Sequence, residues 1–185
     1  MAKTRLAPIL SVAERGELAA HLLRRVLRIV HEAVPDVVVI SPSHALAELV
    51  NDGGARLLVQ RGMGLNEGLE QARRAAIADG IETLVVLHGD LPELEPADVA
   101  ALIGDVPTPR GVAIAPDRAG TGTNGLAMCP ADVIPFRFGT RSRAAHEAAA
   151  AETNAPLAVV ERPGLAFDLD TPEDLRGWLE SGVLA

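Results

Sequence analysis

The sequence has little cysteine and few aromatic residues. Its 185 residues include one cysteine, no tyrosine, one tryptophan and three phenylalanines. A single cysteine allows no intrachain disulfide, which fits a reducing compartment such as the cytosol. The thiol, Cys129, lies in the apolar stretch "GLAMCP" and is interpreted as a core residue rather than a reactive group. With so few aromatic residues, the core has to be built from alanine, valine, leucine and isoleucine.

Long apolar runs and an excess of positive charge are also lacking. The runs "VVVI" and "LVVL" are far too short to span a bilayer, and the residues "MAKTRLAPIL" do not resemble a targeting segment. A net charge of −8 argues against a nucleic-acid partner and against an anionic membrane surface. Hydrophobic residues make up 48% of the chain, so disorder is not expected. The length suits one domain, residues 1–185, with one sizeable core.

Strand-like and helix-like segments alternate along the chain. Ser11 and Glu14 form a capping box, and Leu18, Leu22 and Val26 continue with helical spacing as far as Pro35. Strands are predicted over residues 37–41, 56–60 and 83–88, and helices over 43–49, 67–78 and 96–103. Two strands follow in "GVAIAPD" and "GLAMCP", then an alanine-rich helix to residue 152, one or two short strands in "LAVVERPGLAFDLD", and a last helix.

This alternation predicts an α/β protein: a three-layer α/β/α sandwich with a mostly parallel sheet and helices on both faces. Such sheets bind ligands beyond the carboxyl ends of their strands. One strand is missing from the pattern, because folds of this kind usually begin with a strand and this sequence passes from "AKTRL" directly into a helix. We therefore expect unpaired backbone groups beside the strand at residues 83–88.

Three aspartates suggest a metal site. Asp90 ends the apolar strand in "LVVLHGDLPEL", and Asp168 and Asp170 stand two residues apart in "FDLDTPEDL". Residues i and i+2 of an extended segment face the same side, so both carboxylates can point into one crevice with Asp90. Converging carboxylates with open positions suit Mg²⁺. The alternative is that Asp168 and Asp170 are solvated residues ahead of a helix for which Thr171 is already the N-cap.

Two further stretches suggest an anion site. The three glycines of "RAGTGTNGL" let backbone N–H groups approach an anion, although a plain turn explains them equally well. The stretch "FGTRS" stands at a helix start, where free N–H groups and the Ser142 hydroxyl could bind phosphate. Ser142 could also be only the N-cap, and the two roles are compatible.

Other candidates carry weaker signals. Gly64 and Asn66 of "RGMGLN" could approach a nucleotide, but Asn66 is also a respectable N-cap. Lys3 and Arg5 could bind a triphosphate or be plain solvated charges. His146 lies one turn into the helix after Ser142 and is interpreted as orienting rather than catalytic. His88 precedes Gly89 and Asp90, and no accompanying histidine or cysteine pattern supports zinc.

Taken together, these stretches resemble a known family. The segments "AKTRLAPILSVAERGELA", "GLNEGLEQA", "LVVLHGDLPELEPADV", "APDRAGTGTNGLAM", "FGTRSRAAHEAAA" and "FDLDTPEDL" run through most of the chain in the family's order. They are similar to the guanylyltransferases that activate phosphoenolpyruvate, 2-phospholactate or 3-phosphoglycerate in deazaflavin coenzyme biosynthesis, within the nucleotide-diphospho-sugar transferase-like group. Two departures stand out: His88 and Gly89 where small or proline residues are more usual, and the missing strand and lysine-bearing loop ahead of "AKTRL".

The resemblance implies a role for each candidate residue. Asp90, Asp168 and Asp170 would hold Mg²⁺. Lys3 and Arg5 would meet the triphosphate of GTP and, with Asp90, form the catalytic set. The phosphorylated carboxylic acid would be seated by Thr123, Asn124, Gly139 and Ser142, and the guanosine portion would lie near Gly64, Leu65 and Asn66.

The implied reaction is Mg²⁺-dependent guanylyl transfer from GTP to a small phosphorylated acid, with release of pyrophosphate. Three alternatives remain open at this point: another phosphorylated substrate, another nucleotide, or a non-catalytic nucleotide-binding homologue that lacks the first strand. The expected partners are small molecules, with no nucleic acid and no membrane, and a homodimer is possible because a second chain could supply the missing strand.

Overall fold

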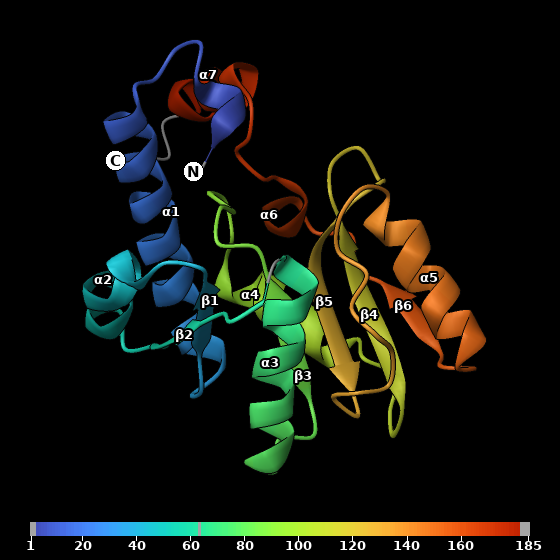
Figure 1. The fold of residues 1–185 in the computed structure, drawn as a ribbon. Coiled ribbons are helices and arrows are strands. Elements are labelled where there is room, and N and C mark those ends of the chain that lie inside the picture. The colour runs from blue at the N-terminus through green and yellow to red at the C-terminus, as the bar shows by residue number, and fades with distance from the viewer. Residues whose placement is uncertain (1–2, 63, 182–185) are drawn as a thin grey trace.

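The chain folds into three layers, and the central layer is a sheet (Figure 1). The computed structural model describes residues 3–62 and 64–181. One face of the sheet is covered by α1 (Val12–Ala33) and α4 (Pro96–Gly104), and the other by α3 (Leu65–Ala78) and α5 (Ser142–Glu152). The predicted α/β/α sandwich is therefore confirmed. None of the helices in the two described ranges is long and apolar enough to cross a membrane.

The larger sheet has four strands in the order β3-β5-β4-β6. The strands are β3 (Leu84–Leu87), β4 (Gly111–Pro116), β5 (Thr123–Cys129) and β6 (Leu157–Val159). β4 runs parallel to β6 and antiparallel to β5, and β5 runs antiparallel to β3. Three of the four strands thus point the same way and only β5 is reversed.

Alternating residues of the central strands build two cores. Ala113 and Ala115 of β4 face α1 and α4, where they pack against Val26 and Leu102. Val112 and Ile114, one residue out of phase, face α3 and α5 on the other side. This two-residue period is what a strand with both faces covered requires. The second core also holds Phe136 and Phe138, two of the four Phe and Trp residues in the sequence.

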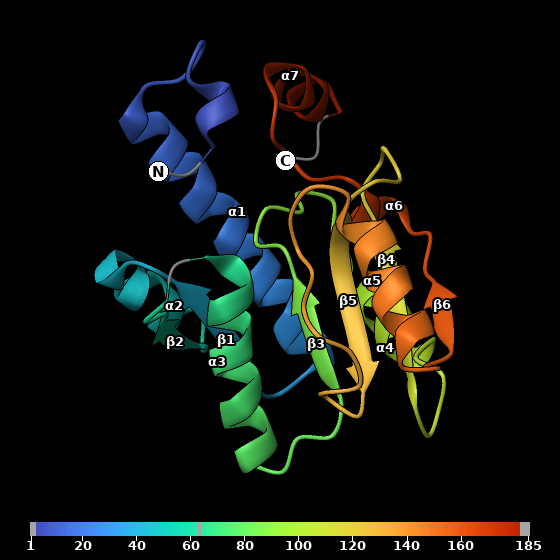
Figure 2. The same ribbon diagram turned by 45° about the vertical axis from the view of Figure 1, so that its right-hand side comes forward.

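A smaller sheet lies beside the larger one (Figure 2). β1 (Val38–Ser41) and β2 (Arg56–Val59) pair in parallel and form no sheet with the other four strands in the described part of the chain. α1 and α3 join the two sheets, since α1 contributes Leu27 to the core of the smaller one and α3 packs on β1. Ile40 of β1 packs against the same core cluster as Leu84 and Val86 of β3.

The outer edge of β3 therefore has no strand partner among the described residues. All four residues of β3 are half-buried, whereas every residue of β4 is buried. Backbone groups along this edge of β3 therefore have no strand partner in the described ranges.

Local signals set most helix boundaries as predicted. Ser11 and Glu14 form the capping box of α1, and Thr171 and Asp174 form that of α7 (Pro172–Glu180). One prediction was wrong in part. The helix expected over residues 43–49 is a short 3-10 helix, His44–Leu46, followed by α2 (Ala47–Asp52), because the Ser43 side chain caps the earlier turn. Of the one or two short strands expected in "LAVVERPGLAFDLD", one forms, β6, and it is followed by α6 (Pro163–Ala166), which has a proline at its start.

The two ends of the described chain pack together. Leu6, in the 3-10 helix Thr4–Leu6, joins Leu22 of α1, Phe167, Leu169 and Trp178 in one buried cluster. This contact holds the segment around Lys3 against the segment that carries Asp168 and Asp170.

Candidate active site

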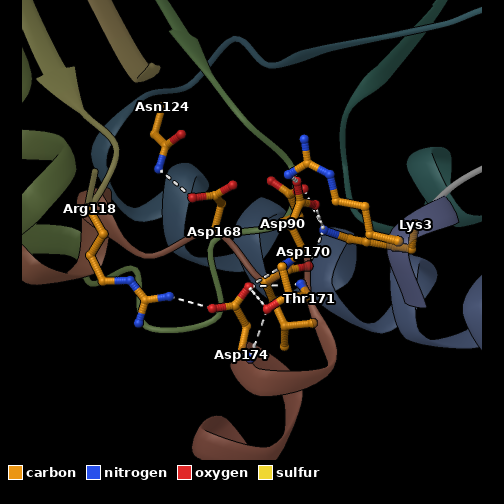
Figure 3. A network of polar contacts seen from close by, with 10 residues as sticks. Lys3, Asp90, Arg118, Asn124, Asp168, Asp170, Thr171 and Asp174 are labelled. Carbon is orange, nitrogen blue, oxygen red and sulfur yellow. Dashed lines mark hydrogen bonds and ion pairs between the residues drawn. The ribbon is translucent and has the colours of Figure 1, made fainter. Parts of the chain in front are cut away.

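The topology brings three distant stretches together at the end of the larger sheet where β3 ends and β5 begins. β5 is antiparallel to β3, so its beginning lies beside the end of β3, where the His88 N–H donates to the Asn124 carbonyl oxygen at 3.0 Å. The Leu169 N–H donates to the Asp90 carbonyl oxygen at 3.2 Å and attaches the third stretch. Figure 3 shows Asp90, Asn124, Asp168 and Asp170 close together at this end.

Lys3 places its ammonium group between two of the predicted metal-binding carboxylates. Its Nζ lies 2.6 Å from Asp90 Oδ2 and 3.1 Å from Asp170 Oδ1, and it also donates to the Leu169 carbonyl oxygen. The Lys3 side chain is only 5% exposed. Arg5 lies at the rim, with its guanidinium 3.4 Å from Asp170 Oδ2. Lys3 and Arg5 therefore join the acidic group, and three oxygen atoms surround one positive charge.

Some of the oxygen atoms around Lys3 Nζ are suited to bind a divalent cation. The second carboxylate oxygen of Asp90, Oδ1, is buried and has no hydrogen-bond partner, which is unusual for a charged group. Asp168 is set apart, because its Oδ1 accepts a hydrogen bond from Asn124 Nδ2 at 3.2 Å. In the described ranges no three acidic, histidine or cysteine side chains gather closely enough to hold a metal ion by themselves. Asp90 and Asp170 are thus the pair suited to a cation that keeps water or phosphate ligands.

The helix that follows the aspartates is anchored by Asp174. Its carboxylate accepts from the Thr171 N–H at 2.8 Å and from the Asp170 N–H at 3.2 Å, and it pairs with Arg118. Burial by itself would raise the pKa of Asp174, but the hydrogen bonds from Thr171, Asp170 and Arg118 together hold that pKa below its usual value. Arg118 also stacks over the Phe167 ring, with 4.4 Å between the guanidinium carbon and the ring centroid. Arg118 thereby fixes the segment that carries Asp168 and Asp170.

The anion site was predicted at the beginning of α5. The N-cap is Arg141, in a left-handed conformation with φ 56°, and it makes no side-chain capping bond. The N-cap role considered for Ser142 is therefore wrong, since Ser142 is the first helical residue and is buried. Gly139, at φ 134°, makes the turn that leads into the helix. An open hollow of about 250 Å³ borders this turn, lined by Gly120, Thr121, Arg141, Arg143, Ala144 and Glu147.

Thr123, at the start of β5, is hydrogen-bonded to a side chain of this helix, His146. Its Oγ1 is 3.1 Å from His146 Nδ1, and the Arg137 N–H donates to His146 Nε2 at 3.0 Å. Burial, assisted by the positive charge of Arg137, lowers the pKa of His146 to about 4. His146 is therefore neutral near pH 7, in agreement with the orienting role expected from the sequence.

The Gly64–Asn66 stretch opens α3. Gly64 is the N-cap at φ 120°, so the capping role considered for Asn66 is wrong. The Asn66 amide instead pairs with the backbone of Phe138: its Nδ2 donates to the carbonyl oxygen at 3.0 Å, and its Oδ1 accepts from the N–H at 2.9 Å. Leu65 is largely exposed. Asn66 therefore ties α3 to the loop that leads to Gly139.

The sequence did not single out Arg118, Arg141, Arg143 or the pairing of Asn66 with Phe138. One signal in the sequence could have pointed to the arginines: Arg118 lies in a glycine-rich stretch, and Arg141 and Arg143 flank Ser142 at a helix start. The Asn66 contact spans 72 residues and leaves no local pattern.

Comparison with known proteins gives a consistent result. The family model described as "Guanylyl transferase CofC like" matches residues 1–182. A phosphoenolpyruvate guanylyltransferase of Rubrobacter xylanophilus is 43% identical over 182 residues, which is 98% of this chain and 89% of the relative. A 3-phospho-D-glycerate guanylyltransferase of Colwellia psychrerythraea is 29% identical over 177 residues, 95% of this chain and 84% of the relative.

Solved structures share the fold at low sequence identity. A crystal structure of 4-diphosphocytidyl-2C-methyl-D-erythritol synthase superimposes with a TM-score of 0.67 at 15% identity, over 89% of this chain and 90% of that one. A CMP:2-keto-3-deoxy-manno-octonic acid synthetase gives 0.56 at 13% identity, over 89% and 88%. Both neighbours have the fold expected of a nucleotidyltransferase. With the family model spanning nearly its whole length, the chain belongs to the CofC-like guanylyl transferase family and is a nucleotidyltransferase.

Proposed function

We propose that the protein transfers GMP from GTP to the phosphate group of a small phosphorylated carboxylic acid and releases pyrophosphate. One observation carries this proposal: the carboxylates proposed for the cation and the helix start proposed for the anion lie at the same end of the sheet. Asn124 connects them, since it donates to Asp168 and directly follows Thr123. A reaction between two anionic substrates needs both features side by side.

The chemistry requires no strong protein base. A phosphate oxygen of the acid forms a bond to the α-phosphorus of GTP, and the bond between that phosphorus and the bridging oxygen to the β-phosphate breaks. A phosphate monoester is mostly dianionic at neutral pH because its second pKa is about 6, so no proton has to be removed first. The protein therefore contributes alignment and charge neutralisation, which explains why His146 can be buried and neutral.

Mg²⁺ is the proposed cofactor. Asp90 and Asp170 would hold it, with Asp168 behind them on Asn124, and Lys3 would move from the cation position toward the triphosphate with Arg5. The ion supplies charge neutralisation at the phosphates and brings the two substrates together. The unpartnered Oδ1 of Asp90 supports this assignment, because a bound cation would give that buried oxygen a partner.

The acid is expected at the start of α5. The Ser142 and Thr123 hydroxyls would bind it there, beside the Gly139 turn, and Arg141 and Arg143 line the hollow at the same helix start. The guanosine portion would lie near Gly64 and Leu65 at the start of α3.

Phosphoenolpyruvate is the acid that the comparisons favour. Two relatives named for that substrate are 43% and 42% identical to this chain, whereas the relative named for 3-phosphoglycerate is 29% identical. The product would then serve deazaflavin coenzyme biosynthesis in the cytosol, as the family resemblance implies.

A substrate matrix tests the proposal. Phosphoenolpyruvate, 2-phospholactate and 3-phosphoglycerate are each combined with GTP, ATP, CTP and UTP, with and without Mg²⁺, and pyrophosphate release is measured. We expect release with GTP and phosphoenolpyruvate, and only with Mg²⁺ present. Release with another nucleotide in preference to GTP would contradict the assignment.

A nucleotide-binding protein without turnover is the second candidate. It is favoured by the Lys3 ammonium, which fills the cation position, and by the open edge of β3 beside it. Calorimetric titration with GTP and Mg²⁺, combined with the pyrophosphate assay, separates the two functions. A binding protein without turnover binds GTP but releases no pyrophosphate with any combination of acid and nucleotide.

A further inference from the structure

His146 is enclosed on every side. It lies in the second turn of α5 with no exposed surface. Its ring meets the Phe138 ring edge-on, with 4.9 Å between centroids. The Phe138 backbone is in turn held by two hydrogen bonds with the Asn66 amide, one in each direction. The orientation of the imidazole is thus fixed from α3 as well as from α5.

The two nitrogens of His146 have different partners, and these decide where its proton lies. The Arg137 backbone N–H can only donate, so His146 Nε2 has to accept that bond at 3.0 Å. A neutral imidazole carries one proton, which therefore sits on Nδ1. Nδ1 then donates to Thr123 Oγ1 at 3.1 Å.

The Thr123 hydroxyl is left with one free hydrogen. Its oxygen accepts from His146, so its own O–H has to point elsewhere. No described residue accepts a hydrogen bond from it, although Thr123 is only 2% exposed. A buried donor without an acceptor is costly, by about 1–3 kcal/mol, unless a ligand or a water takes the bond.

We propose that His146 is a positioning residue that makes the Thr123 hydroxyl an obligate hydrogen-bond donor to the phosphorylated acid. The inference rests on the proposed function and adds to it a rule of selection. Because the hydroxyl hydrogen is directed away from His146, it favours an acceptor oxygen of the ligand at that point, and an ionised carboxylate or phosphate oxygen is the strongest such acceptor. His146 never touches the substrate and takes no part in proton transfer.

The tautomer can be observed without any ligand. Long-range 1H–15N correlation spectra of the 15N-labelled full chain distinguish an Nδ1–H imidazole from an Nε2–H one. We expect His146 in the Nδ1–H form at pH 7 and still neutral at pH 5.5. An Nε2–H tautomer or an imidazolium at pH 7 overturns the inference, whatever the enzyme turns over.

A double-mutant cycle tests how His146 and Thr123 affect the affinity for the acid. Dissociation constants for phosphoenolpyruvate and for GTP with Mg²⁺ are measured by calorimetry for Thr123→Val, His146→Leu and the double variant. Loss of a hydrogen bond to a charged oxygen weakens binding by about ten- to a hundred-fold. We expect Thr123→Val to show this loss for phosphoenolpyruvate, with GTP affinity changed less than about two-fold.

The double variant separates positioning from plain structural support. If His146 acts through Thr123, His146→Leu weakens acid binding in the native background but hardly further in the Thr123→Val background. Two conservative variants serve as controls: Thr123→Ser keeps the hydroxyl, and the His146→Gln amide can donate to Thr123 while accepting from Arg137. Both should bind phosphoenolpyruvate within about three-fold of the native protein.

Each outcome has a definite meaning. Additive losses in the double variant, or equal losses for GTP and phosphoenolpyruvate, would show that His146 only supports the fold and would overturn the inference. Should His146→Leu fail to fold, the comparison of Thr123→Val with Thr123→Ser still decides whether the hydroxyl donates to the acid. Non-additive losses of acid binding, together with no pyrophosphate release from any substrate pair, would refute the proposed function but still support the positioning role of His146.

Discussion

Single residues carry the strongest expectations, and Asp90 is first among them. One of its carboxylate oxygens is bonded to Lys3 and the other is buried without a partner. Asp90→Asn keeps the size of the side chain while removing its charge. We expect Mg²⁺-dependent turnover to fall by more than about a hundred-fold, which corresponds to about 3 kcal/mol of transition-state stabilisation.

The matched control for Asp90 is Asp79→Asn. Asp79 is an exposed C-cap residue at the far end of α3 and is remote from the site. Initial rates across a range of Mg²⁺ concentrations, with circular dichroism as a check on folding, make the comparison. Near-native activity of Asp90→Asn in Mg²⁺ would show that the cation site lies elsewhere.

Ser142 allows binding to be separated from helix capping. It is buried at the first position of α5 and does not cap the helix. Ser142→Ala is therefore expected to weaken phosphoenolpyruvate binding about ten-fold, to leave GTP binding within about two-fold, and to change the melting temperature by less than about 2 °C.

Ser11→Ala provides the contrasting case for Ser142→Ala. The Ser11 side chain accepts from the Glu14 N–H in a true capping box, so its loss should lower stability by about 1 kcal/mol without changing acid binding. Thermal melts and calorimetric titrations on both variants make the comparison. A Ser142→Ala variant that behaves like Ser11→Ala would mean that Ser142 has only a structural role.

The buried imidazole of His146 also makes stability depend on pH. Its pKa is about 4 in the folded protein, against a usual value of 6.5 in the unfolded chain. Between these values the unfolded state binds more protons, so stability rises with pH and falls on acidification. This one group removes up to about 3 kcal/mol as the pH drops from 6.5 to 4.

Urea unfolding at several pH values between 5 and 7 measures this slope, with His146→Gln as the comparison because a glutamine does not titrate. The window stops at about pH 5 because carboxylates begin to protonate below it. Parallel slopes for the native protein and the variant would contradict the assignment of a neutral, buried His146.

At the scale of the elements, the sheet is unequally protected. β4 is paired on both sides, whereas β3 is paired only with β5 and its side chains are half-buried. Amides that face an open edge exchange through local opening rather than global unfolding. We expect β3 amides to exchange at least about ten-fold faster than those of β4 in hydrogen-exchange mass spectrometry or NMR. Equal protection of the two strands would mean that the β3 edge is covered in solution.

Elements defined by neighbouring residues could be predicted, and those defined by distant contacts could not. The capping boxes at Ser11 and Thr171 work within three residues, so both helix starts were visible in the sequence. The reversal of β5 was not visible, because an apolar strand shows the same pattern in either direction. That reversal is what brings Thr123 and Asn124 beside Asp90. Motifs could therefore supply candidate site residues, but not their pairings: Asn66 with Phe138, His146 with Thr123, and Lys3 with the aspartates.

For the whole molecule, charge and function agree in a specific way. The net charge is −8, although both proposed substrates are anions. Binding of the proposed substrates would therefore depend on local cations rather than on the overall field. The cations proposed for this role are Lys3 and Arg5 at the aspartates, and Arg141 and Arg143 at the α5 start.

The division of the sheet into two parts bears on how cooperatively the protein melts. β1 and β2 have their own small core of Leu27, Leu49, Val50 and Ala55, and share no strand pairing with the larger sheet in the described residues. The two units are coupled through α1 and α3 rather than through strand pairing, so the smaller one should come apart first on heating. Scanning calorimetry should then give a van't Hoff enthalpy below the calorimetric one, because the transition involves a populated intermediate. A polypeptide segment that bridged β1 and β3 would merge the two units, and the two enthalpies would become equal.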